Sequence, residues 1–181
     1  VFASLSAVAM GVVFEPSVKA ETNSGLTAAL HKAKVFPPSS GATVSLIDRQ
    51  AVVEVFHFAA DGAARRKVAI FAARALVNYA AGQFNTIAVK FYEPGGTASY
   101  SEIIVNARDI TSLVVGTIKV DELAASVSQV DISPSDSKVS IFNKYLGAAE
   151  KQIEQGHYWE AEQIVDSAAR IHGNPPETNG R

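Results

Sequence analysis

The sequence predicts an α+β fold: a small mixed sheet of about four strands in the order β-β-α-β-β-α, a helix covering it, and a C-terminal antiparallel helical hairpin. Two observations and one packing rule lead to this prediction. Short β-branched segments with alternating polarity lie on either side of an alanine-rich segment with helical spacing. From residue 139 the apolar spacing becomes helical and stays so to residue 172. A helix laid on a sheet buries both apolar surfaces in two packed layers.

The first twenty residues have the pattern of a secretory signal peptide. They carry no charge before Glu15 and end in Val18-Lys19-Ala20, with small or β-branched residues where a signal peptidase inspects the chain. This apolar run is shorter than the ~20 residues that span a bilayer. We therefore expect residues 1–20 to be a signal peptide without its basic start, and the protein to be secreted or periplasmic with no stable membrane span after cleavage. An N-terminal core helix is the alternative.

Residues 21–41 are expected to form a linker. They hold a possible short helix at 26–34 and then Pro37-Pro38-Ser39-Ser40-Gly41, in which paired prolines cannot continue a helix. The ordered α+β domain is then expected to span residues 42–132.

The domain opens with two β-branched segments, 43–47 and 51–58, separated by a polar turn, so an antiparallel hairpin is predicted. Asp61 is expected to cap the next helix, because its side-chain oxygen can accept from an orphan N–H group of the first turn. Apolar residues recur at helical spacing from Ala64 to Tyr79, which predicts a helix over 61–82.

Alternating segments follow at 84–92 and 98–105, joined by Glu93-Pro94-Gly95-Gly96. Proline presets the first central residue of a type II turn and glycine accepts the positive φ at the second, so a second hairpin is predicted. The two strands that the helix connects either neighbour each other through a crossover or lie at opposite edges of the sheet. Glu54 and Glu102 could face each other across the sheet, and we expect them on a solvated face.

Two short helical segments, 108–115 and 121–127, are expected to cover a sheet edge or the second face. An extended stretch at 130–132 then leads into a linker at 133–138, where Ser-Pro-Ser-Asp-Ser breaks the pattern. Residues 173–181 are polar, with glycine and proline, and are expected to be a disordered tail.

Residues 139–172 form the predicted helical hairpin, and this region resembles a single tetratricopeptide repeat. Tyr145 stands at the large aromatic position of the first helix, Ala148-Ala149 at the small-residue crossing, and Gln155-Gly156-His157-Tyr158 at the turn. Ala161 and Ala168 match the small residues of the second helix. The resemblance implies a protein-interaction role, self-assembly included, and brings no catalytic residue with it.

The chain also departs from this family. Gln152 and Val165 replace aromatic residues, and Gly173 replaces the closing proline, with Pro175-Pro176 just beyond. One unit is present where a stacked array needs about three. A plain two-helix hairpin with alanine at its contact is the alternative.

Composition narrows the possible functions. Cysteine is absent, which excludes disulfides, thiol catalysis and cysteine-ligated metals. The net charge is −2 and the basic residues are scattered, so no nucleic acid is expected as a partner. The four histidines lie in four different segments, and no serine-nucleophile, phosphate-loop or dinucleotide motif is convincing. We therefore expect no catalytic residue, no metal site and no cofactor.

The leading functional hypothesis is an exported, non-enzymatic interaction or assembly module that binds a protein partner or itself. Its candidate interaction surface is His157, Tyr158 and Trp159, because large aromatic residues at a helical turn either pack beneath it or anchor an interface. The alternative is a small-molecule-binding protein or enzyme with a pocket between the sheet and helix 61–82, near His57, Tyr79 or Tyr100.

Overall fold

The structure is a computed structural model that describes residues 22–93 and 99–173. The predicted signal peptide, the Pro94-Gly95 turn and all of the predicted tail except Gly173 lie outside the described residues. Within the described part of the chain, no helix has the length and apolar character needed to cross a membrane.

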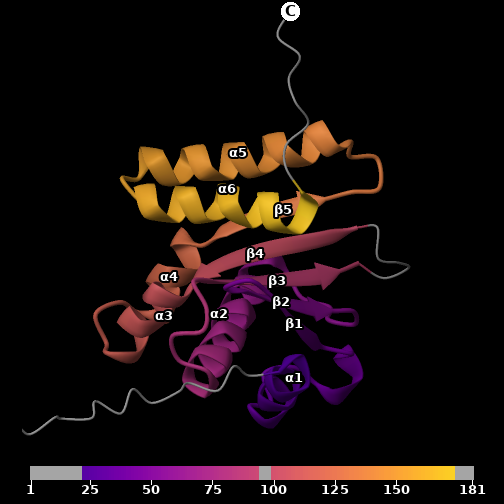
Figure 1. The fold of residues 1–181 in the computed structure, drawn as a ribbon, viewed down its shortest axis with the longest axis vertical. Coiled ribbons are helices and arrows are strands. Elements are labelled where there is room, and N and C mark those ends of the chain that lie inside the picture. The colour runs from indigo at the N-terminus through magenta and orange to yellow at the C-terminus, as the bar shows by residue number, and fades with distance from the viewer. Residues whose placement is uncertain (1–21, 94–98, 174–181) are drawn as a thin grey trace, which may run out of the picture.

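A mixed five-stranded sheet forms the middle layer of the molecule (Figure 1). Its strands lie in sequence order: β1 (Thr43–Ile47), β2 (Gln50–Val55), β3 (Thr86–Tyr92), β4 (Tyr100–Asn106) and β5 (Ser128–Ile132). β2 and β3 are parallel neighbours, and all other neighbouring pairs are antiparallel. The α+β class and both hairpins are thus confirmed, and the opposite-edge alternative is excluded. The expected stretch at 130–132 belongs to a fifth strand, which pairs with β4.

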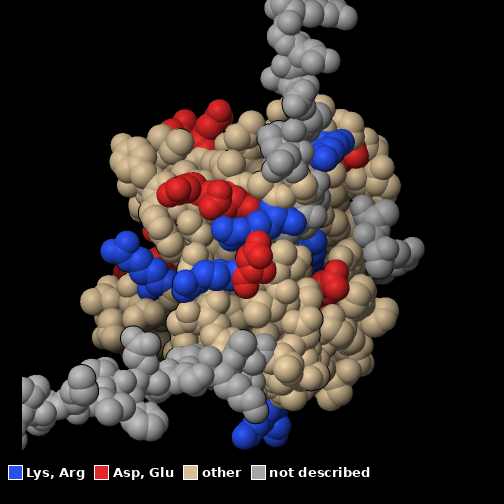
Figure 2. Space-filling model, viewed as in Figure 1, with Lys and Arg blue, Asp and Glu red and all other residues tan. Residues whose placement is uncertain are grey.

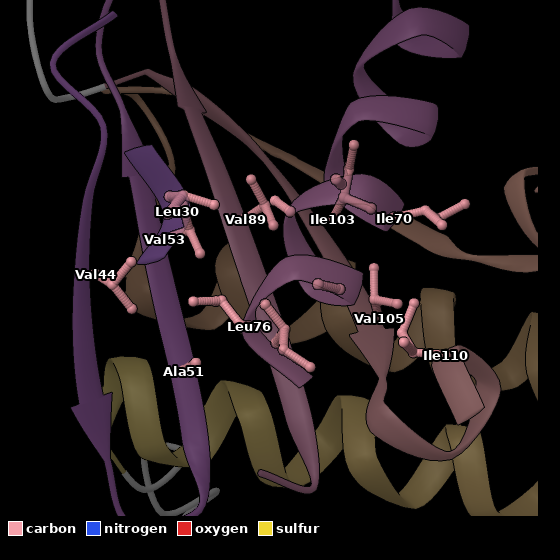
Figure 3. Packing of buried hydrophobic residues seen from close by; sticks show 14 of the residues in the cluster. Leu30, Val44, Ala51, Val53, Ile70, Leu76, Val89, Ile103, Val105 and Ile110 are labelled. Carbon is pink, nitrogen blue, oxygen red and sulfur yellow. The ribbon is translucent and has the colours of Figure 1, made fainter. Parts of the chain in front are cut away.

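Four helices cover one face of this sheet: α1 (Asn23–Lys32), α2 (Gly62–Tyr79), α3 (Ala107–Val114) and α4 (Val120–Ser126). Asp61 caps α2 as predicted, because its Oδ1 accepts from the Ala64 N–H at 2.7 Å. The inner face of α2 is built from alanines and two larger residues, Ile70 and Leu76, all buried against the strands (Figure 3). α3 and α4 pack against α2 in this same layer, so they leave the second face of the sheet to other elements.

The N-terminal segment differs from the expected linker. Residues 23–32 form α1, and a short 3-10 turn follows at Pro38–Ser40. Leu26 and Leu30 are fully buried in the core shared with α2 and β1. α1 ends at Lys32, before the paired prolines, and Lys34 follows with φ +54°. Burial of the two leucines makes this segment part of the packed domain.

The C-terminal hairpin consists of α5 (Lys138–Glu154) and α6 (Tyr158–His172), joined by a turn in which Gly156 has φ +80°. It covers the second face of the sheet, so the molecule has three layers (Figure 1). Ile104, Val130 and Ile132 of the sheet pack there against Phe142 and Tyr145 of α5. The predicted hairpin is confirmed. Its apolar stripe packs on the second face of the sheet, because that face would otherwise be exposed to solvent.

Candidate functional site

The predicted interaction surface of His157, Tyr158 and Trp159 lies at the start of α6, and its three residues differ in exposure. Tyr158 is 68% exposed, whereas His157 and Trp159 are half-buried. His157 Nδ1 lies 3.0 Å from Gln152 Oε1, and Nδ1 is the donor because an amide oxygen only accepts. Tyr158 alone of the three is therefore presented freely to a partner.

Tyr158 belongs to a larger set of exposed apolar residues on the outer side of the hairpin. Val139, Leu146 and Ile153 recur every seven residues on one face of α5, and Val165 lies seven residues after Tyr158 on α6. We call these five residues the outer stripe. Exposed apolar groups that gather in one region mark interaction surfaces in soluble proteins.

A buried polar contact fixes the hairpin to the sheet. Tyr145 Oη donates to Glu102 Oε2 at 2.8 Å, and both side chains are fully buried. Glu102 was expected on a solvated face, and this was wrong because the hairpin covers it. In the sheet register Lys90 stands between Glu102 and Glu54, so the two carboxylates flank a cation.

The electrostatics of this contact follow from its burial. Loss of water raises the pKa of Glu102, and the nearby Lys90 charge and the Tyr145 hydroxyl oppose that rise. The pKa of Tyr145 is also raised, first by burial and then by the Glu102 charge. The pair has no route to solvent, so it holds α5 in place and does not meet a ligand.

The two edges of the sheet differ in how far other elements satisfy their backbone hydrogen-bonding groups. At the β1 edge, the Val44 N–H donates to Thr27 Oγ1 and the Leu46 N–H donates to Asn23 Oδ1, each at 2.9 Å. Side chains of α1 therefore satisfy the donors of β1 that a further strand would use. A covered edge of this kind resists pairing with other chains.

The β5 edge is open by comparison. Lys144 Nζ donates to the Asp131 carbonyl at 2.8 Å, so this carbonyl points away from β4. In an antiparallel strand a residue's N–H and C=O lie on one side and alternate along the chain, so Gln129 and Asp131 direct these groups outward. Within residues 22–93 and 99–173, no acceptor pairs with either outward N–H.

A groove of about 660 Å³ runs beside this open edge, between β5 and α5. Gly147 and Ala148 form part of its α5 wall, so little side chain obstructs the strand. Three cations also line it, Arg66, Lys144 and Lys151. The Arg66 guanidinium is held toward β5 by donating to Gln129 Oε1 at 3.2 Å. The site thus combines an unpaired strand edge, adjacent free volume and positive charge.

The residues named for the alternative pocket lie in different places: His57 lines a hollow of about 510 Å³ together with Arg65, and Tyr79 lines one of about 500 Å³ between α1 and α2. Tyr79 ends α2 and is 47% exposed, while exposed His57 precedes the start of that helix. The eighteen-residue α2 is about 27 Å long, and Tyr79 is its last residue. Tyr100 packs on the other face of the sheet, against the hairpin. The interface between α2 and the strands is filled with buried alanine, isoleucine and leucine rather than hollowed.

Charged side chains of both signs are interspersed on the face shown in Figure 2, over α6 and just below it. Across the described ranges, no group of three or more histidine, aspartate or glutamate side chains could hold a metal ion. No family model, curated protein or solved structure matches this chain.

Nothing in the sequence singled out the groove. Its walls come from α2, α4, β5 and α5, which are distant along the chain, and β5 was expected only as a short extended stretch. The one available hint was the apolar alternation at Val130 and Ile132, which a longer predicted strand would have used.

Proposed function

We propose that this protein is a non-enzymatic interaction module that binds an extended segment of a partner protein by strand addition to β5. The observation that carries the proposal is the contrast between the edges of the sheet: α1 satisfies β1, whereas β5 leaves outward N–H groups beside a groove. Strand addition gains affinity from main-chain hydrogen bonds and specificity from alternate side chains. The five residues of β5 match a bound segment of about 17 Å.

The charges of the groove favour an acidic segment. Arg66 and Lys151 carry charges that no described ion pair neutralises, while Lys144 pairs with Asp136 at one end. Aspartate or glutamate side chains of a bound strand could approach the first two cations. Complementary charge speeds encounter and excludes wrong partners more than it adds affinity.

The helical hairpin supports this role in two ways. It forms a wall of the groove, and the buried contact between Tyr145 and Glu102 keeps that wall fixed to the sheet. Its resemblance to a tetratricopeptide repeat, a class of interaction unit, is consistent with a partner protein. The outer stripe around Tyr158 provides a second contact surface, for the same partner or for a second copy of the chain. We further propose that the protein is exported, as the pattern of residues 1–20 predicts.

The test uses a display library of random peptides selected against the full chain, followed by binding measurements on two variants. Gln129→Pro removes an outward N–H without removing a hydrogen bond to β4, and proline is tolerated on edge strands. Gln129→Ala removes the same side chain but keeps the N–H, so it is the matched control. We expect acidic extended peptides to be selected, to bind wild type and Gln129→Ala, and to lose binding to Gln129→Pro.

Amide hydrogen exchange gives an independent readout. A bound strand should slow exchange of the Gln129 and Asp131 N–H groups and leave that of Val44, already bonded within the chain, unchanged. Selected peptides that bind Gln129→Pro as well as wild type, with no slowing at these two amides, would contradict strand addition. Peptides protecting the outer stripe instead would move the interaction to the hairpin.

A further inference from the structure

A second hollow lies where the hairpin turn meets α3 and α4. It is a cavity of about 120 Å³, well above the ~10–15 Å³ that holds one water molecule. Its walls come from β4, α3, α4, β5, α5 and α6. It shares Ser126, Val127, Ser128 and Gln152 with the groove beside β5, whereas Asn106, Asp109, His157 and Glu160 line the cavity alone.

The polar groups of this cavity are mainly hydrogen-bond acceptors. Asp109 and Glu160 supply two carboxylates, and Asn106, which is 6% exposed, has a buried Oδ1 with no partner. Asn106 Nδ2 donates to Asp109 Oδ2 at 3.4 Å, whereas no described group donates to Asn106 Oδ1. A buried acceptor without a donor costs about 1–3 kcal/mol, so such an atom points to a missing donor.

His157 adds a further acceptor. Its Nδ1 donates to Gln152 Oε1 at 3.0 Å, so in the neutral ring Nε2 carries the lone pair. Gln152 is itself fixed, because its Nε2 donates to the Ser126 carbonyl at 2.8 Å and to Ser128 Oγ at 3.1 Å. This chain of bonds sets the tautomer of a histidine that lines the cavity.

The two carboxylates lack a cation of their own. In the described part of the chain, no lysine or arginine forms an ion pair with Asp109 or Glu160. Burial and the neighbouring Glu160 charge raise the pKa of Asp109, against weaker opposing effects of Asn106, His157 and Arg108. Two carboxylates therefore lie close together here, and Arg108, the cation that acts on Asp109, forms no ion pair with either of them.

We propose that this cavity binds a primary ammonium group, with Asp109, Glu160, Asn106 Oδ1 and His157 as its acceptors. A metal ion does not suit these residues, since no described set of three histidine or acidic side chains can hold one. An ammonium group carries three N–H donors and one positive charge, which match a set of acceptors with surplus negative charge. The group can come from a small free amine or from a lysine side chain of a partner.

The experiment titrates the full chain with methylammonium chloride and follows the fluorescence of Trp159, the sole tryptophan, together with the His157 ring signals in NMR spectra. Tetramethylammonium chloride has the same charge but no N–H donor, and sodium chloride controls for ionic strength. We expect a saturable change with methylammonium alone. Asp109→Asn and Glu160→Gln should each weaken binding about tenfold or more, since each removes a charge-assisted hydrogen bond.

Glu162→Gln, on the exposed side of α6, is the matched control and should bind as wild type does. If Asp109→Asn does not fold, Glu160→Gln decides the question alone. A capped Ala-Lys-Ala peptide, compared with its acetyl-lysine form, separates the two sources: tighter binding than methylammonium indicates a lysine of a partner, and weaker binding indicates a free amine. Equal responses to methylammonium and tetramethylammonium, or unchanged binding by both carboxylate variants, would overturn the proposal.

Discussion

Replacing Tyr145 by phenylalanine tests whether the buried contact with Glu102 holds the hairpin on the sheet. The substitution keeps the ring and deletes one hydroxyl, which donates to Glu102 Oε2 at 2.8 Å in a fully buried setting. The other oxygen of this carboxylate, Oε1, has no hydrogen-bond partner, so the hydroxyl is the side-chain donor to the carboxylate and adds to the larger effect of the Lys90 charge. A hydrogen bond to a charged group contributes about 1.5–3 kcal/mol to the free energy of unfolding.

The loss can be measured by urea and thermal unfolding at pH 7, followed by circular dichroism. A protein of this size loses about 2–4 °C of melting temperature per kcal/mol, so Tyr145→Phe should melt about 3–12 °C below wild type. In a Glu102→Gln background, Tyr145→Phe should lower the free energy of unfolding by less, because the hydrogen bond that it removes there joins two neutral groups. A free energy of unfolding within about 0.5 kcal/mol of wild type would refute the anchoring role.

The pH dependence of stability gives a second check on the same pair. The pKa of Glu102 is raised in the folded protein above its ordinary value of 4.5, mainly by burial. A carboxyl with a raised folded pKa contributes stability that is complete below the unfolded pKa and is lost as pH rises through the folded pKa. Glu102→Gln should therefore remove a decline in stability that begins near pH 4.5, and Tyr145→Phe should extend that decline to higher pH. An unchanged profile in Glu102→Gln would show that the carboxyl does not titrate as this burial requires.

Two further predictions concern the elements that frame the groove and the closed edge. Asp61→Ala should lower the free energy of unfolding, measured in urea, by about 0.5–2 kcal/mol, because the Ala64 N–H loses its cap. Asp61→Asn keeps a capping oxygen and should lower it by only about a few tenths of a kcal/mol. Equal losses in the two variants would contradict capping. Thr27→Val should cost about 1–3 kcal/mol and speed amide exchange at Val44, because the β1 edge loses the side-chain acceptor that covers it. Exchange at Val44 as slow as in wild type would show that α1 does not protect that edge.

Local sequence patterns correctly predicted the elements whose structure depends on neighbouring residues. The alternation at 84–92 and the helical stripe between Ala64 and Tyr79 each produced the expected element, and Asp61 caps the helix as predicted. The change of period at residue 139 correctly predicted the hairpin. In each of these cases the hydrogen bonds and side-chain spacing that define the element lie within a few residues of one another.

Contacts between distant segments could not be predicted in this way. Glu102 is a charged residue in an alternating strand, which predicts a solvent-exposed position. It is buried because α5 lies over it. Leu26 and Leu30 stand in a polar lead-in, yet their burial against β1 and α2 makes α1 part of the core. The acceptors of the small cavity, Asn106 and Glu160 among them, come from separate elements, so no motif could join them.

The sequence by itself thus determined an α+β chain with a helix between two strand hairpins and a helical hairpin at its end, because periodicity and turn chemistry are local properties. Only the tertiary structure decided that the hairpin covers the second face of the sheet, that β1 is closed while β5 stays open, and that an acceptor-lined cavity forms beneath the hairpin turn. These features depend on which surfaces of distant segments bury each other, and that choice is made by the free energy of packing the whole chain.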